Sequence, residues 1–204
     1  MKFRSALLLA AMVLFPARSQ AQDFGVMESA ETINLGNFKL MANPLFIFGK
    51  DGGSGDNRIV LGAGFPVTSR LDIEGKAAFG SGTQIFGGNA EYWMMKHEPL
   101  DLSVIGGLHF VRGNEQLDTT AVDFTLLGSK HVGKRLEPYG ALDIAFNRIT
   151  DDRFRGDKSY TQVHLVPGIE YAISDELDFL AEVGIGVTDS SRHYVSFGIA
   201  YYIR

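Results

Sequence analysis

The chain contains no cysteine in its 204 residues. Disulfide bonds, thiol catalysis and zinc binding through cysteine are therefore excluded. After residue 21 it also has no apolar run that approaches the roughly 18 residues of a membrane-spanning helix. If the mature chain enters a membrane, it must do so as a closed β-barrel, because a barrel pairs all of its backbone groups without a helix.

Basic residues are scarce as well. The chain has 19 Lys and Arg against 24 Asp and Glu, a formal net charge of −5. The basic residues are not clustered, whereas a nucleic-acid surface needs clustered Lys and Arg to neutralise phosphates. The chain is therefore a poor candidate for binding nucleic acid, and we expect no such partner.

Residues 1–21 have the features of a secretory signal peptide. Lys2 and Arg4 precede an unbroken apolar run over residues 6–15, and Ser19-Gln20-Ala21 offers small residues for cleavage. The apolar run is too short to cross a bilayer as a helix. We therefore expect an exported chain.

The expected mature chain is acidic and has two parts. Removal of the signal peptide leaves 16 basic residues against 24 acidic ones, a formal charge of −8. We expect residues 22–32 to form an N-terminal periplasmic arm. Residues 33–204 are expected to form one β-barrel domain.

A Leu followed directly by a carboxylate recurs four times, each time after a short polar turn. The pairs are Leu71-Asp72, Leu100-Asp101, Leu136-Glu137 and Leu177-Asp178. After each pair, apolar residues alternate with polar or small ones for about ten positions, as on the two faces of a β-strand. Each pair is therefore expected to begin a strand.

Turn residues divide the chain into ten candidate strands, most of them long enough to cross a bilayer at a tilt. They cover residues 33–48, 58–66, 71–80, 84–95, 100–112, 119–131, 137–148, 160–172, 177–187 and 193–204. The predicted fold class is all-β, a closed antiparallel up-and-down transmembrane β-barrel. An eight-stranded barrel is the alternative if the first candidate strand, which Pro44 interrupts, does not pair.

The connections between these strands alternate between short turns and mostly longer loops rich in Gly and Asp. Outer-membrane barrels show this asymmetry, with short periplasmic turns and longer external loops. An even strand count then places both chain ends on the periplasmic side. Pro44 and Pro167 fall inside proposed strands. Because proline lacks a donor for the ladder, each predicts either a β-bulge or strand limits that differ from the proposed ones.

Alternation alone does not tell which face of the barrel meets the solvent. A soluble periplasmic barrel of the lipocalin type has the same period, with its apolar set lining a cavity for a hydrophobic ligand. In this chain the polar set is rich in Gly, Ala and Ser, which suits a crowded barrel interior better than a soluble surface. We therefore predict that the apolar face contacts lipid.

The closing segment, residues 194–204, alternates aromatic and apolar residues with small ones. Together with the signal peptide and the ten strands, it resembles small bacterial outer-membrane β-barrel proteins of the OmpA/OmpX-like type. In that class the last strand usually ends in an aromatic residue that the barrel-assembly machinery reads. Here Ile203-Arg204 follow Tyr201 and Tyr202, so the match is not complete. The resemblance implies the cell outer membrane as location, with outer-membrane lipid and the assembly machinery as partners; we expect a monomer.

The predicted polar face carries more acids than bases. Its titratable residues are Lys39, Asp72, Glu74, Lys76, Glu91, Asp101, His109, Asp123, Asp143, His164, Glu170, Asp178 and Glu182. One interpretation is a polar network that fills a narrow lumen, since buried charges need partners. The other is a narrow pore, because rings of acids favour cations. The expected function is a structural or surface-interaction role, or a weak pore.

Catalytic and metal-binding patterns are absent from the sequence. His193 and Ser196, the best candidates for a lipid hydrolase, have the wrong spacing and lie on opposite strand faces. No Gly-x-Ser-x-Gly or His-Glu-x-x-His occurs, and residues 51–57 lack the spaced ligands of a calcium loop. We therefore predict no enzyme, no cofactor and no metal, with a membrane-embedded lipid or peptide hydrolase as the remaining alternative.

Overall fold

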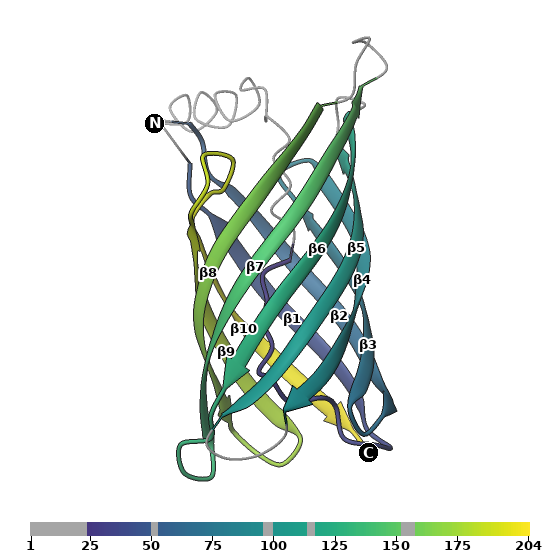
Figure 1. Ribbon diagram of the computed structural model, residues 1–204, viewed down its shortest axis with the longest axis vertical. Helices are drawn as coiled ribbons and strands as arrows, with labels where there is room; N and C mark the ends of the chain where they lie inside the picture. The colour runs from purple at the N-terminus through teal and green to yellow at the C-terminus, as the bar shows by residue number, and fades with distance from the viewer. Residues whose placement is uncertain (1–23, 50–52, 96–99, 114–116, 152–157) are drawn as a thin grey trace, which may run out of the picture.

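The computed structural model describes residues 24–49, 53–95, 100–113, 117–151 and 158–204 (Figure 1). The predicted signal peptide lies outside these residues. Within them the chain forms ten strands: β1 (Phe38–Ile47), β2 (Asp56–Thr68), β3 (Leu71–Gly80), β4 (Thr83–Met95), β5 (Asp101–Gly113), β6 (Leu117–Ser129), β7 (Leu136–Asp151), β8 (Lys158–Ala172), β9 (Leu177–Gly186) and β10 (Tyr194–Ile203). No helix in the described part of the chain is long and apolar enough to cross a membrane.

The ten strands form one closed barrel in which every strand is antiparallel to its neighbours in the chain. β1 closes the ring by pairing with β10, so that Phe38 lies opposite Ile203 (Figure 1). The predicted all-β barrel and its strand number are confirmed. The eight-stranded alternative is wrong, because β1 pairs on both sides.

The solvent exposure of the strand side chains shows that the apolar face of each strand points away from the barrel interior. In β3, Asp72 is 3% exposed and Ile73 is 40% exposed, and the same alternation continues through Glu74 and Lys76 to Phe79. Large apolar side chains are exposed on the outer wall in all ten strands. A soluble protein does not expose so large an apolar surface. The soluble lipocalin-like alternative is therefore wrong, and the outer wall suits lipid.

The Leu-acid pairs mark strand starts, as predicted. Leu71, Leu136 and Leu177 are the first residues of β3, β7 and β9, and Asp101 is the first residue of β5. The side chains that follow the Leu residues point inward because successive strand residues alternate between faces. The pairs therefore set the register at the short-turn end of the barrel.

The bulges predicted at Pro44 and Pro167 are not present. Pro44 pairs with Ile59 and Pro167 with Gly140, and neither ladder changes register there. Each proline instead leaves a gap in the ladder on its other side, without an inserted residue. At Pro44 the hydroxyl of Ser196 donates to the free carbonyl at 2.9 Å. The register shifts occur at other places, between Pro66 and Thr68 and between Trp93 and Met95.

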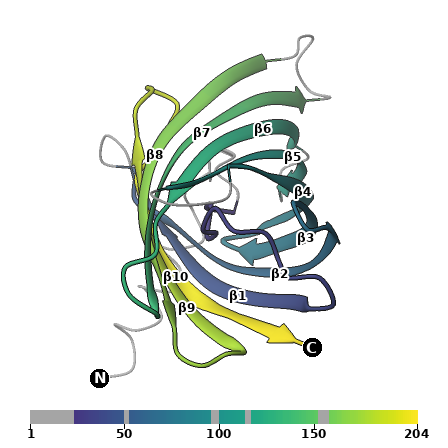
Figure 2. The ribbon, with the colours of Figure 1, turned by 60° about the horizontal axis from the view of Figure 1, so that its bottom comes forward.

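The N-terminal segment lies inside the barrel. Sequence analysis predicted a periplasmic arm over residues 22–32, but residues 24–33 are seen in the middle of the ring of strands (purple in Figure 2). Val26, Met27 and Ala30 are all buried there. The arm prediction is thus wrong for residues 24–32: residues 24–33 occupy the lumen, and residues 34–37 lead out to β1. Residues 22 and 23 of the predicted arm lie outside the described residues.

Two tyrosines pack flat against glycines of the neighbouring strand inside the lumen. Tyr139 lies opposite Gly168 and Tyr194 opposite Gly184. A Cβ added at either glycine would overlap the tyrosine ring. Both glycines are therefore required for close approach and not for an unusual backbone conformation.

We expect Gly184→Ala to destabilise the barrel by about 1–3 kcal/mol, because the added methyl group forces the Tyr194 ring out of its place. Gly75→Ala is the matched control, since an added Cβ there meets nothing within 4 Å. The measurement is urea unfolding of the refolded barrel in detergent, followed by the heat-dependent shift in gel migration. Equal midpoints for the two variants would contradict this packing account.

Candidate functional site inside the barrel

Glu182 of β9 binds the tip of the N-terminal segment. Its carboxylate accepts hydrogen bonds from the backbone N–H of Val26 at 2.9 Å and of Met27 at 2.7 Å. Gly25 and Met27 have φ angles of 72° and 50°, in the left-handed region. Such a backbone turns successive N–H groups toward one anion, and a non-glycine residue holds this conformation only when its surroundings enforce it. Glu182 is the group that enforces it.

The same carboxylate is supported from the barrel wall. The hydroxyl of Tyr139 donates to Glu182 at 2.9 Å, and Tyr194 also hydrogen bonds to it. Both tyrosines reach this point because they lie over their glycine neighbours. Glu182 is buried, so these donors replace the water that a carboxylate loses on burial.

A second set of contacts joins the segment to β1 and β3 through charges. Lys39 lies 2.7 Å from Glu74, and Lys76 lies 3.3 Å from Glu74 and 2.9 Å from Glu28. All four side chains are almost fully buried. Glu28, on the segment, therefore brings a second carboxylate to this group and contacts Lys76. Removing one partner of such a buried network leaves an uncompensated charge, which is costly.

Backbone N–H groups fasten the remaining length of the segment. Ala30 donates to the hydroxyl of Ser129 at 3.0 Å, and Ile33 donates to Asp72 at 2.9 Å. Ser129 in turn donates to Glu137. Since β6 and β7 supply Ser129 and Glu137, and β3 supplies Asp72, the segment is held by opposite parts of the wall. It thereby closes the half of the lumen that lies at the short-turn end.

Beyond the tip of the segment lies a small cavity of about 60 Å³, lined by both polar and apolar residues. Its lining includes Phe24, Asn89, His109, Asp123, Thr125, Asp143, Gln162, His164 and Tyr194. The Phe24 ring packs edge-on against His109 with a centroid distance of 5.6 Å. A volume of this size accommodates a few water molecules or one small ion, not a sugar or a lipid.

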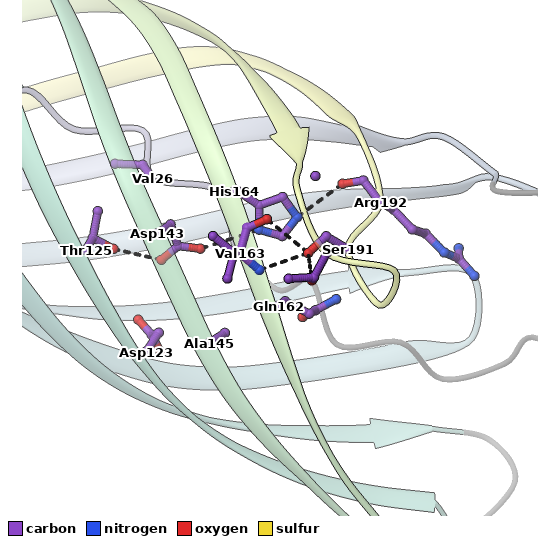
Figure 3. Close-up of polar contacts among 12 residues, drawn as sticks. Val26, Asp123, Thr125, Asp143, Ala145, Gln162, Val163, His164, Ser191 and Arg192 are labelled. Atoms are coloured by element: carbon purple, nitrogen blue, oxygen red, sulfur yellow. Dashed lines mark hydrogen bonds and ion pairs between the residues drawn. The ribbon is translucent and has the colours of Figure 1, made fainter.

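Two histidine–aspartate pairs face this cavity. His109 Nδ1 lies 2.9 Å from Asp123, and His164 Nδ1 lies 3.8 Å from Asp143, which accepts from Thr125 at 2.8 Å (Figure 3). His164 Nε2 lies 3.2 Å from the Arg192 carbonyl. A carbonyl can only accept, so that nitrogen carries a proton and the other nitrogen faces Asp143.

The connection between β9 and β10 covers the free edge of β8. Strand β8 continues beyond the end of β9, and Ser191 replaces the missing strand by accepting from Val163 N–H at 2.9 Å and donating to its carbonyl at 3.0 Å (Figure 3). Gln162 also donates to the Ser190 carbonyl at 3.1 Å. The loop therefore closes the wall of the cavity where the ladder ends.

The structure places the residues of the predicted polar face as follows. Eight are buried inside the barrel: Lys39, Asp72, Glu74, Lys76, Glu91, His109, His164 and Glu182. Five are partly buried: Asp101, Asp123, Asp143, Glu170 and Asp178. Several of these side chains contact one another. Lys39 and Lys76 are ion-paired with Glu74, His109 and His164 lie beside Asp123 and Asp143, and Glu170 is hydrogen-bonded to Asp178.

Of the residues that connect the segment to the wall, Asp72, Lys76 and Glu182 were on the predicted polar face, and sequence reasoning missed the others. Glu28 and Met27 lie in a stretch with no strand period, and Tyr139 and Tyr194 look like ordinary strand aromatics. Among the missed residues, only Glu137 could have been found from the sequence, because it belongs to one of the Leu-acid pairs. The contacts of Val26 and Met27 with Glu182 join residues 156 and 155 positions apart in the chain.

A closed barrel with an apolar outer wall and a charged, filled interior is the form of an integral outer-membrane protein. The outer membrane protein beta-barrel domain family matches residues 6–201, and the chain belongs to this family. The protein therefore lies in the cell outer membrane, and the resemblance to small outer-membrane barrels is confirmed. Among curated proteins, none matches the sequence significantly.

Solved structures share the fold at low sequence identity. An outer membrane channel from Pseudomonas putida F1 is similar with a TM-score of 0.62 and 10% identity, over 90% of this chain and 100% of that one. The translocator domain of autotransporter NalP from Neisseria meningitidis is similar with a TM-score of 0.51 and 9% identity, over 82% and 89% of the two chains. At this identity the likeness concerns the fold alone.

We expect Glu182→Gln to release the N-terminal segment from the lumen, because an amide cannot accept all the hydrogen bonds that converge on the carboxylate. The readout is the rate at which a thiol reagent labels Ala30→Cys, a buried position in a chain without native cysteine. Loss of a charged hydrogen bond costs about 1.5–3 kcal/mol, so labelling should accelerate about tenfold or more.

The control for this experiment is Glu176→Gln, which removes a carboxylate in the turn before β9. It should leave labelling of Ala30→Cys slow. Rapid labelling already in the Ala30→Cys parent, or no change with Glu182→Gln, would show that Glu182 does not hold the segment.

Proposed function

We propose that this outer-membrane barrel is a narrow, gated pore that favours small cations, with residues 24–33 as its gate. The observation that carries the proposal is the closure of half the lumen by the chain's own N-terminal segment. The segment is attached through hydrogen bonds and ion pairs to side chains of the wall, and not through strand pairing. Such contacts can be exchanged for water when the segment moves.

The width of the barrel supports a gate. Side chains alone fill the interior of an eight-stranded barrel, and diameter grows with strand number. In this ten-stranded barrel the inward positions next to the segment include small residues such as Gly64, where an added Cβ would overlap Glu74 and Ile33. The wall therefore leaves room for the segment.

The charge of the interior supports a preference for cations. Inward carboxylates outnumber inward lysines, and acids that line a narrow passage favour cations. Beyond the segment, Asp123 and Asp143 keep 20% and 24% of their side-chain surface exposed to the cavity. A passing ion would meet both carboxylates in the half of the lumen that the segment leaves free.

A closed barrel with a structural or surface-interaction role is the second candidate. It is favoured by the pairing of Lys39, Lys76, Glu28 and Glu74, which satisfies these charges without any permeating ion. For either role we infer insertion as a monomer by the barrel-assembly machinery. The alternating apolar residues Phe197, Ile199 and Tyr201 on the outer face of β10 support this inference.

We further infer that the protein is not an enzyme. His164, Asp143 and Ser191 lie near one another and resemble a hydrolytic triad in composition (Figure 3). However, the Ser191 hydroxyl is engaged with both backbone groups of Val163, and His164 Nε2 contacts the Arg192 carbonyl. These contacts leave neither a free nucleophile nor a base that faces it.

Planar-bilayer recordings test the gated pore. We expect the mature chain to be nearly silent, and a chain that also lacks residues 22–33 to show discrete, cation-selective openings because half of its lumen is no longer filled. In the shortened chain, Asp123→Asn with Asp143→Asn should reduce the preference for cations, whereas Glu176→Gln should not.

Folding of each variant is checked by the heat-dependent shift in gel migration. A shortened chain that folds and yet does not conduct would rule out the pore and leave the closed barrel as the function. A mature chain that conducts as strongly as the shortened one would show that the segment is not a gate.

A further inference from the structure

Three metal-binding side chains converge at the short-turn end of the barrel. They are Glu31 of the N-terminal segment, His131 of the turn between β6 and β7, and Glu137 of β7. One ligand atom from each lies within 4.8 Å of the other two. His131 Nε2 lies 2.9 Å from Glu31 Oε1, and His131 Nδ1 lies 3.7 Å from Glu137 Oε2.

The spacing suits one metal ion. Three atoms at most 4.8 Å apart have a common centre no more than about 2.8 Å from each, and zinc bonds to imidazole and carboxylate ligands measure about 2.0–2.2 Å. To bind one ion, each of the three ligand atoms therefore needs to move by less than about 1 Å. Glu31 and His131 can make such shifts, because their side chains are 37% and 52% exposed.

Glu137 supplies a ligand whose position is fixed by its surroundings. Its side chain is 5% exposed, and one of its oxygens accepts a hydrogen bond from Ser129. The other oxygen faces His131. An ion that arrives from the aqueous side would therefore meet the rigidly held carboxylate of Glu137 and the more mobile side chains of Glu31 and His131.

The surroundings of His131 are strongly acidic. Partial burial lowers its pKa, but the hydrogen bond to Glu31 and the charges of Glu137, Glu31 and Asp101 outweigh burial and raise the pKa above its usual value. The same carboxylates attract a divalent cation, which neutralises more of their charge than a single proton does.

We propose that Glu31, His131 and Glu137 form a binding site for a divalent first-row transition ion, represented by Zn²⁺. Imidazole is a good ligand for such ions and a poor one for Ca²⁺ or Mg²⁺, while the two carboxylates add charge. The ion links the N-terminal segment to the barrel wall at its mouth. Its effect on conductance rests on the proposed pore, whereas binding itself does not.

Calorimetry on the refolded full-length mature chain tests the site, with ZnCl₂ and CaCl₂ as titrants. We expect one Zn²⁺ per barrel and a Kd that rises at least about tenfold in His131→Gln and in Glu31→Gln, since changes even outside the ligands cost 10–100-fold. The matched control is His193→Gln, an exposed histidine between β9 and β10. X-ray absorption of the zinc complex should show one imidazole nitrogen.

Zn²⁺ bound in the same manner by His131→Gln would overturn the site, as would Ca²⁺ binding of equal strength that persists in that variant. In a Val26→Cys, Glu182→Gln chain, whose buried thiol lies at the tip of the segment and away from the proposed ligands, Zn²⁺ should slow thiol labelling at least about tenfold, and His131→Gln should abolish this effect. Unchanged labelling with Zn²⁺ bound would overturn the link between segment and wall.

These readouts do not depend on conductance. Zinc binding and slowed labelling in a protein whose shortened form stays silent would support the metal site and reject the pore. A shortened form that conducts, in a protein that binds no Zn²⁺, would support the pore and reject the metal site.

Discussion

The structure depends on one constraint: inside a bilayer, every backbone N–H and C=O group must find a partner within the protein. A ring of antiparallel strands meets this constraint only when the last strand pairs with the first, as β10 does with β1. Closure also explains the tolerance of Pro44 and Pro167. Each leaves a short gap in one ladder without shifting the register, and at Pro44 a serine hydroxyl takes the place of the missing partner.

Closure with ten strands creates a second requirement, because the interior is too wide for side chains alone. The chain fills it with large side chains that lie over glycines and with its own N-terminal segment. The segment brings N–H groups to buried carboxylates and brings Glu28 to the buried Lys76. The same segment therefore fills the lumen and supplies partners for its buried charges. Because a small number of polar contacts holds the segment, those contacts decide whether the lumen is closed.

Much of the barrel could be predicted because strand residues alternate with a period of two. The third strand was predicted over residues 71–80 and found as Leu71–Gly80, and the inward position of Asp72, Glu74 and Lys76 followed from the same period. The bulges could not be placed, because a gap in one ladder and an inserted residue look alike in the sequence. The segment before β1 has no period, so its location was predicted wrongly.

The sequence by itself determined the fold class, the membrane, where most strands begin and which side chains point inward. Each of these follows from local alternation and from turns between neighbouring strands. Only the tertiary structure decided what the inward side chains contact. The bonds from Val26 and Met27 to Glu182, and the approach of Glu31 to His131 and Glu137, join distant parts of the chain that meet only after the barrel has closed around the segment.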